Sequence, residues 1–382
     1  MAVILIGRYN SAVVHTKTIE ESAKKQIIDL LNSPASEGSQ SIVIMPDVHP
    51  GKGSVIGLTM TITDRIVPNL CGVDLSCGVR TVKLADKKID LAQLDEAIRT
   101  HVPSGKNIRT VMHRVASCIE RSLPVQLRCV SYTDIERALY GIGTLGGGNH
   151  FIEVDSDEEG SLYLLIHSGS RHIGKQVAEY YQKRAIQECP CKDNPDLAYL
   201  TGQSMTDYLF DASLMTMYAT LNRRAIQETI VEEMNLQVVD AFDTLHNYIA
   251  SKKFSDGSQA YTEYLIRKGS VSAESMERFI VPLNMRDGSL ICKGKGNREW
   301  NWSAPHGAGR CLSRKEARIL FSLDYFQKEM EDAGVCSTTI NESTLDEAPE
   351  AYKDSSEIES QLAETADVLN HLTPIYNYKA GE

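Results

Sequence analysis

One histidine of the sequence stands in a setting that favours phosphate chemistry. His306 lies within residues 303–310, between a proline and a pair of glycines, and an arginine follows. Ser313 and Glu316 have the spacing of a capping box, which predicts that a helix begins directly after this loop. Free backbone N–H groups and the helix dipole favour an anion at such a place. The loop therefore makes His306 a candidate nucleophile or acid/base group, with an ordinary surface histidine as the alternative.

Asp74 and Cys77 form a second candidate site within the glycine-flanked segment 71–80. A carboxylate and a thiolate three residues apart can bind a divalent metal, and the glycines let the backbone wrap around it. Taken alone, the pair is equally typical of a buried structural cysteine beside a turn aspartate. Further ligands from elsewhere in the chain must decide between these interpretations.

Residues 141–154 combine a dense run of glycines with His150. Residues 141–146 match G-x-G-x-x-G, but a dinucleotide site needs a helix after the motif, and residues 150–154 read as a strand. The glycines are expected instead to bring the backbone close to a ligand. The same setting recurs at His167, which stands in a small-residue loop beside Arg171 and ahead of a predicted helix. This recurrence indicates an anion-handling site.

His246 falls in a stretch whose spacing predicts a helix over residues 237–250. Val239, Phe242 and Ile249 share a face with it at helical spacing. A histidine on an apolar helix face is most often a satisfied core residue. From this stretch alone, His246 is not a metal ligand.

The elements that must position these residues alternate between strands and helices. Strand 42–45 ends at Asp47 and His49, in a rigid loop of the kind that carries function on a scaffold. The candidate residues come from widely separated segments, which predicts one interleaved α+β domain over residues 1–382. Other strands are expected at 3–6, 12–15, 79–84, 150–154 and 162–166, and helices at 20–31, 207–233 and 313–334.

Composition restricts the class of protein. The 382 residues carry a net charge of −11, so a protein that coats nucleic acid non-specifically is excluded and any such contact must be local. Nine cysteines, an odd number, do not suggest a disulfide framework in a chain of this length. No apolar run approaches membrane-spanning length. We therefore expect a cytoplasmic protein with reduced thiols and no membrane contact.

Taken together, the motifs resemble the RtcB family of RNA-splicing ligases, in the family's order and across most of the chain. The matching segments are 47–51, 72–80, 146–151, 167–171, 246–247, 306–310 and 346–354.

The resemblance implies a compact mixed α/β fold of the RtcB type and a ligase that depends on GTP and on two Mn²⁺ ions. Its substrates would be RNA ends bearing a 2′,3′-cyclic phosphate or 3′-phosphate and RNA ends bearing a 5′-hydroxyl. A cyclic phosphate would first be opened to a 3′-phosphate. His306 would take GMP from GTP and pass it to that phosphate, and Asp47 would assist the 5′-hydroxyl step.

The family pattern also assigns roles to other residues. Cys77 would bridge two metal ions, with Asp74 and His150 on one and His167 and His246 on the other. The ligand types alone do not choose manganese over zinc. The expected nucleotide contacts are Asn149, Glu153, Ala308, Tyr352 and Lys379. The expected phosphate and RNA contacts are Arg171, Arg310 and Arg314.

Two segments depart from the family pattern. Residues 266–269 read Ile-Arg-Lys-Gly, without the histidine that many members carry, and residues 294–302 lack the usual form. These departures suggest a divergent branch, with RNA repair rather than tRNA splicing as its role. Two alternatives to the ligase are an enzyme that guanylylates a 3′-phosphate without sealing and a non-catalytic RNA-binding relative.

Overall fold

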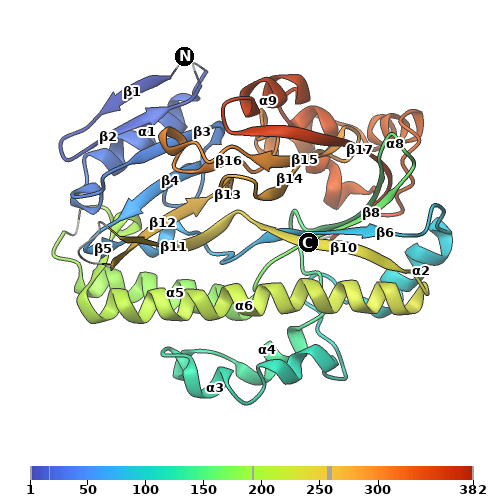
Figure 1. Ribbon diagram of the computed structural model, residues 1–382, viewed down its shortest axis with the longest axis horizontal. Helices are drawn as coiled ribbons and strands as arrows, with labels where there is room; N and C mark the ends of the chain where they lie inside the picture. Colours follow the sequence, from blue (N-terminus) through green and yellow to red (C-terminus); the bar gives the residue numbers. More distant parts are fainter. Residues whose placement is uncertain (1, 17, 192, 256–259, 381–382) are drawn as a thin grey trace.

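A computed structural model describes residues 2–16, 18–191, 193–255 and 260–380. The fold is a mixed α+β arrangement, as predicted, with two large sheets (Figure 1). In the first sheet β2 and β3 are parallel, and the other neighbours are antiparallel. Its order is β1 (Val3–Ile6), β2 (Ser11–Val14), β3 (Ile42–His49), β4 (Ile56–Ile62), β12 (Ala260–Lys268) and β11 (Asn247–Ser255).

The second large sheet is antiparallel throughout. Strand β17, the last in sequence, lies in its interior between β7 and β15. The order is β10 (Val238–Leu245), β6 (Gly78–Leu84), β8 (Leu162–Ser168), β7 (Phe151–Ser156), β17 (Ala366–Lys379), β15 (Gly288–Gly294) and β14 (Arg278–Asn284). Two short pairs complete the strands: β13 (Ser270–Ser272) with β16 (Ser303–Pro305), and β5 (Arg65–Ile66) with β9 (Leu200–Thr201).

Helix α6 (Gly202–Glu233) runs beneath the sheets for most of the length of the molecule, and α5 (Arg171–Glu188) lies along it (Figure 1). Buried side chains recur along α6, including Tyr208, Met215 and Ile226, because the sheets and other helices cover different parts of it. The remaining α-helices are α1 (Glu21–Leu31), α2 (Leu91–His101), α3 (Leu123–Gln126), α4 (Ile135–Gly141), α7 (Arg314–Leu320), α8 (Leu323–Asp332) and α9 (Ser355–Leu362).

The helix predicted over residues 237–250 is wrong. This stretch forms β10 and β11, and His246 lies at the junction between them. Val239, placed on the apolar face of the expected helix, is 61% exposed. Strand β10 pairs with β6 and β11 pairs with β12, so backbone pairing across the two sheets overrides the helical spacing of the apolar residues.

The helix predicted after Ser313 is two helices. The capping box of Ser313 and Glu316 is present and starts α7, but α7 ends at Leu320. Ile319 of α7 is 73% exposed, whereas Phe326 and Met330 of α8 are buried. The rejection of a dinucleotide fold is confirmed, because strand β7 rather than a helix follows the glycine-rich segment 141–148.

Candidate active site

Most of the candidate residues line one cavity of about 670 Å³. Asp47 lies directly behind His306, while His150 and Arg171 line a smaller cavity of about 280 Å³. Asp74 lines both. The candidates that line the larger cavity are Asp74, Cys77, Asn149, Glu153, His167, His246, His306, Ala308, Arg310, Arg314, Tyr352 and Lys379.

Strand register explains how ligands so distant in sequence meet. Gly78 of β6 is opposite Leu245 of β10 on one side and Ser168 of β8 on the other. Phe151 of β7 is opposite His167. Cys77 directly precedes Gly78, His246 follows Leu245 and His150 precedes Phe151, so all four ligand candidates lie in one row across adjacent strands. The sequence could not show this row, because it depends on the β10–β6 pairing.

The side chains in this row converge on the sulfur of Cys77. Its Sγ lies 3.1 Å from Nε2 of His167 and 3.5 Å from Nε2 of His150. His150 Nε2 is 3.0 Å from Oδ2 of Asp74, and His167 Nε2 is 3.4 Å from Nε2 of His246. The thiol therefore stands between an Asp–His pair and a His–His pair.

The tautomers of two histidines follow from their other ring nitrogens. Nδ1 of His150 is 2.9 Å from the carbonyl oxygen of Leu145, and Nδ1 of His167 is 3.1 Å from that of Asn149. A carbonyl only accepts, so both Nδ1 atoms carry the proton and both Nε2 lone pairs face the sulfur. Nitrogen lone pairs that converge on one sulfur are what a bound cation requires, and a Cys/His/Asp donor set suits a divalent transition metal.

Burial determines the ionisation of these groups. It holds the pKa values of His167 and His246 well below the usual range, so both are neutral as metal ligation requires. Burial, reinforced by Asp74, raises the pKa of Cys77 well above its usual range, while the charge of Arg223 opposes the rise. A thiolate at this position therefore needs a metal ion to stabilise it.

His306 stands at the edge of this cluster, its ring centroid 5.2 Å from that of His246. Its Nδ1 is 2.7 Å from Oδ2 of Asp47, which also accepts the backbone N–H of His306 at 3.1 Å. Asp47 is completely buried and His306 is partly exposed. The carboxylate thus holds the proton on Nδ1 and leaves the Nε2 lone pair available for reaction.

His49 was not among the predicted site residues, although it lines the larger cavity. Its Nδ1 lies 3.0 Å from the carbonyl oxygen of Asp47. Burial lowers the pKa of His49 to about 4, so its ring is neutral near pH 7. The expectation of a loop after residue 45 is wrong, because β3 continues through Asp47 to His49, which pairs with Ile56 of β4. The position of His49 two residues after Asp47 was the available signal.

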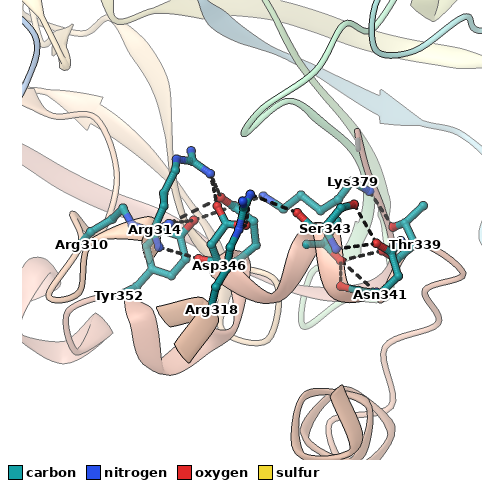
Figure 2. A network of polar contacts seen from close by, with 11 residues as sticks. Arg310, Arg314, Arg318, Thr339, Asn341, Ser343, Asp346, Tyr352 and Lys379 are labelled. Carbon is teal, nitrogen blue, oxygen red and sulfur yellow. Dashed lines mark hydrogen bonds and ion pairs between the residues drawn. The ribbon is translucent and has the colours of Figure 1, made fainter. Parts of the chain in front are cut away.

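Arg310, Arg314 and Lys379 form a cationic wall on one side of the cavity. Two buried carboxylates that the sequence reasoning missed, Asp346 and Glu347, hold this wall in place (Figure 2). Glu347 is 2.8 Å from Nζ of Lys379 and 2.8 Å from Arg314, and it accepts the hydroxyl of Tyr352 at 2.7 Å. Asp346 pairs with Arg314 and with Arg318, one helical turn further along α7. Although burial alone would raise the pKa of Glu347, Lys379 and Arg314 hold it well below the usual range.

Glu153 forms a second buried acidic group at the cavity. Asn377, its partner across the β7–β17 pairing, donates a hydrogen bond to its carboxylate. Asp155, on the same face of β7, is fully buried, and neither of its carboxylate oxygens has a hydrogen-bond partner. Burial raises the pKa values of both Glu153 and Asp155. The neighbouring carboxylate of Glu153 raises the pKa of Asp155 further, so this arrangement favours a protonated Asp155 that can share its proton with Glu153.

Arg171 lies apart from the other two arginines. Its backbone has a positive φ of 57°, and its guanidinium packs against Gly146, where a Cβ atom would overlap it. Its Nε is buried without a hydrogen-bond partner. Nη1 of Arg171 is 3.2 Å from Nδ1 of His150, but that nitrogen already donates its proton to the carbonyl oxygen of Leu145. A buried guanidinium in this position is available to an anion in the smaller cavity.

The two segments that depart from the family pattern, 266–269 and 294–302, make contacts that stabilise the fold. The buried ammonium of Lys268 donates to the carbonyl oxygens of Lys52, Ser54 and Asn69 and so ties two loops together. Trp300 is buried and stacks on His15 with ring centroids 3.5 Å apart. Segment 294–302 therefore packs against the first sheet through Trp300.

Within the described part of the chain, no helix has both the length and the apolar character needed to cross a membrane. All nine cysteines are free thiols.

Comparison with known proteins identifies the family of the chain. A family model described as tRNA-splicing ligase RtcB matches residues 29–380. The RNA-splicing ligase RtcB of Escherichia coli K12 is 31% identical, over 92% of this chain and 91% of its own length. RtcB1 of E. coli strain ATCC 25922 is 30% identical with the same coverage, and the tRNA-splicing ligase RtcB of Aeropyrum pernix is 25% identical over 86% of each chain. The seven motifs, their convergence on one cavity and these matches place the chain in the RtcB family.

Proposed function

We propose that the protein is an RNA ligase that joins 2′,3′-cyclic phosphate or 3′-phosphate ends to 5′-hydroxyl ends, using GTP and Mn²⁺ through a histidine–GMP intermediate. The observation that carries this proposal is the pairing of His306 with Asp47 at the edge of the Cys/His/Asp cluster. A neutral imidazole with one nitrogen fixed and the other free is a competent nucleophile toward phosphorus. RNA repair is the proposed role.

Two metal ions would be held by Asp74, Cys77 and His150 on one side and by Cys77, His167 and His246 on the other. When bound, they would neutralise phosphate charge and help align the attacking and leaving oxygens. The chain supplies the rest of the chemistry. Glu153, Asn149, Ala308, Tyr352 and Lys379 would hold the nucleotide.

The reaction begins with the opening of a cyclic phosphate by water to give a 3′-phosphate. Nε2 of His306 then attacks the α-phosphorus of GTP, and pyrophosphate leaves. The proton stays on Nδ1, where the carboxylate of Asp47 balances the positive charge that the imidazole acquires. Arg310 and Arg314, which line the cavity, would contact phosphates of the nucleotide and of the RNA.

In the second half of the reaction, the RNA 3′-phosphate displaces His306 from GMP and becomes an activated end. The 5′-hydroxyl attacks the RNA phosphorus, and GMP leaves. Asp47 would assist this step, and Arg171 in the smaller cavity would contact an RNA phosphate. RNA selectivity would rest on the chemistry of the ends rather than on base sequence.

Incubation with α-labelled GTP and MnCl₂ tests the intermediate. Label should stay with the denatured wild-type protein and be absent from His306→Ala. His101→Ala, which changes a histidine outside both cavities, should label normally. An unlabelled wild-type protein would sink the histidine–GMP mechanism.

Sealing is tested separately, with one RNA ending in a cyclic phosphate and another beginning with a 5′-hydroxyl. A joined product supports the ligase. Accumulation of a guanylylated 3′ end without joining would identify the capping alternative, and RNA binding without either product would identify a non-catalytic relative.

A further inference from the structure

Arg223 of α6 is completely buried at the base of the metal-ligand row, and nothing above gives it a role. Its Nη1 donates to the carbonyl oxygen of Ser76 at 3.1 Å and to that of Ser168 at 2.9 Å. Its Nε donates to Oδ1 of Asp243 at 2.8 Å. One planar guanidinium therefore joins three segments of the second sheet to the helix beneath it.

Each of these three contacts lies close in sequence to a metal-ligand candidate. Ser76 directly precedes Cys77, Ser168 directly follows His167, and Asp243 is three residues before His246. The contacts are made to backbone oxygens in the first two cases, so they fix the course of the chain itself rather than a side-chain rotamer. A change in the position of Arg223 would thus move Cys77 relative to His167.

The backbone at Ser76 gives a second, independent sign of restraint. Its φ of 60° lies in the left-handed region, which is unfavourable for serine and persists only where the surroundings enforce it. Thr216, two helical turns before Arg223 on α6, contacts the Ser76 hydroxyl at 2.7 Å. The Ser76 N–H donates to the carbonyl oxygen of Asn247 at 2.6 Å. Helix α6 therefore holds the strained residue beside Cys77 from two of its positions.

We infer that Arg223 is a positioning residue that sets the distance between the Cys77 sulfur and the two imidazoles of His167 and His246, and through that distance the affinity of the site for metal. The inference rests on the metal-dependent function proposed above. It assigns to α6 a part in metal binding, although no α6 side chain is among the proposed ligands.

Arg80 provides a matched control. It lies on β6 and pairs with the other oxygen of Asp243, Oδ2, while its Nε contacts Gln227. Its hydrogen bonds go to these two side chains and not to the backbone of Ser76 or Ser168. Arg80→Lys and Arg223→Lys therefore each weaken an ion pair with Asp243, but only the second removes the contacts to the ligand-bearing loops.

The experiment is a titration of the purified full-length chain with CoCl₂, monitored by the thiolate-to-cobalt charge-transfer absorption in the near ultraviolet. Arg223→Lys should bind Co²⁺ at least 10-fold more weakly than wild type and show a shifted or weakened band, whereas Arg80→Lys should stay within 2-fold. The histidine–GMP yield of Arg223→Lys should recover substantially at saturating MnCl₂, because the nucleophile is intact.

Thr216→Val probes the same restraint without disturbing a buried charge and remains informative if Arg223→Lys does not fold. It should weaken Co²⁺ binding about 3-fold at an unchanged melting temperature. If Arg223→Lys and Thr216→Val both bind Co²⁺ with wild-type affinity and spectrum, the inference is overturned while the proposed function stands. The same follows if Arg80→Lys loses as much Co²⁺ affinity as Arg223→Lys. A wild-type protein with no charge-transfer band would overturn the metal-dependent function and the inference with it.

Discussion

The contact between Oδ2 of Asp47 and Nδ1 of His306 is the shortest hydrogen bond of the proposed nucleophile. It orients the imidazole and also places a negative charge beside it. A neutral amide in place of the carboxylate can preserve the geometry but cannot balance a positive imidazole. The link joins residues 259 positions apart, so no local pattern could have predicted it. The sequence assigned Asp47 to the 5′-hydroxyl step, and the structure adds a contact between its carboxylate and the ring of His306.

Asp47→Asn should therefore slow formation of histidine–GMP by roughly 10²–10⁴-fold, with little change in GTP affinity. The rate of label transfer from α-labelled GTP at saturating nucleotide gives the first quantity, and equilibrium binding gives the second. A normal transfer rate would remove Asp47 from the chemistry of His306.

The pair Glu153–Asp155 predicts a pH dependence of stability. Burial raises the pKa of Glu153 from 4.5 to about 7 and that of Asp155 well above its usual range, so between pH 4.5 and about pH 7 the unfolded chain binds fewer protons than the folded one. The pair's contribution to stability must then fall as pH rises through this range. Asp155→Asn supplies a permanent donor to Glu153 and removes one titration, and it should gain about 1 kcal/mol over wild type at high pH.

Thermal unfolding at several pH values from 3 to 9 measures this effect. The difference in melting temperature, variant minus wild type, should grow with pH. Asp157→Asn is a control of opposite sign: burial raises the pKa of Asp157, but hydrogen bonds from Ser161 and Tyr163 outweigh it and lower the pKa. That variant should lose stability relative to wild type as pH rises through the acidic range, and a flat difference for Asp155→Asn would contradict the shared proton.

At the scale of elements, the 3-10 helix Glu342–Glu347 holds the cationic wall through its last two residues. Removing the charge of Glu347 leaves Arg310, Arg314 and Lys379 close together without their common partner. Glu347→Gln should cost about 3 kcal/mol of stability. Glu329→Gln, which weakens a more exposed pair with Arg286, should cost less than about 1 kcal/mol.

Chemical denaturation of the two variants compares these costs. Because an anion can replace the lost carboxylate, phosphate or GTP should raise the melting temperature of Glu347→Gln more than that of wild type. Equal stabilisation of both proteins would show that the three cations do not depend on Glu347.

Elements also show where prediction from the sequence succeeded and where it could not. Strands β3, β6, β7 and β8 are bounded by glycine-rich loops and were expected close to their observed positions. Residues 237–250 were misassigned because Val239, Phe242, His246 and Ile249 fit a helix equally well, and only pairing with β6 and β12 decides the outcome. The seven motifs identified the candidate ligands. The contacts of Glu347 with the cationic wall and of Arg223 with the ligand-bearing segments could be identified only from the three-dimensional structure.

Across the whole molecule the net charge is −11, so contact with RNA must depend on a few placed cations. Arg171, Arg310 and Arg314 are the proposed phosphate contacts. With about three phosphates neutralised on single-stranded RNA, the logarithm of the binding constant should fall with the logarithm of salt concentration with a slope of about −2. Fluorescence anisotropy between 50 and 300 mM KCl measures the slope, and a value near −6 would indicate a much wider basic surface.

The interior position of β17 has a consequence for biogenesis. Ribosomes make β6, β7, β8, β14 and β15 well before residues 366–379 emerge, and until then β7 and β15 present unpaired edges rich in buried-type residues. Lys379, which completes the cationic wall, arrives with the same strand. Nascent chains stalled before residue 366 should be sensitive to protease and bind chaperones, because the edges of β7 and β15 still lack their partner.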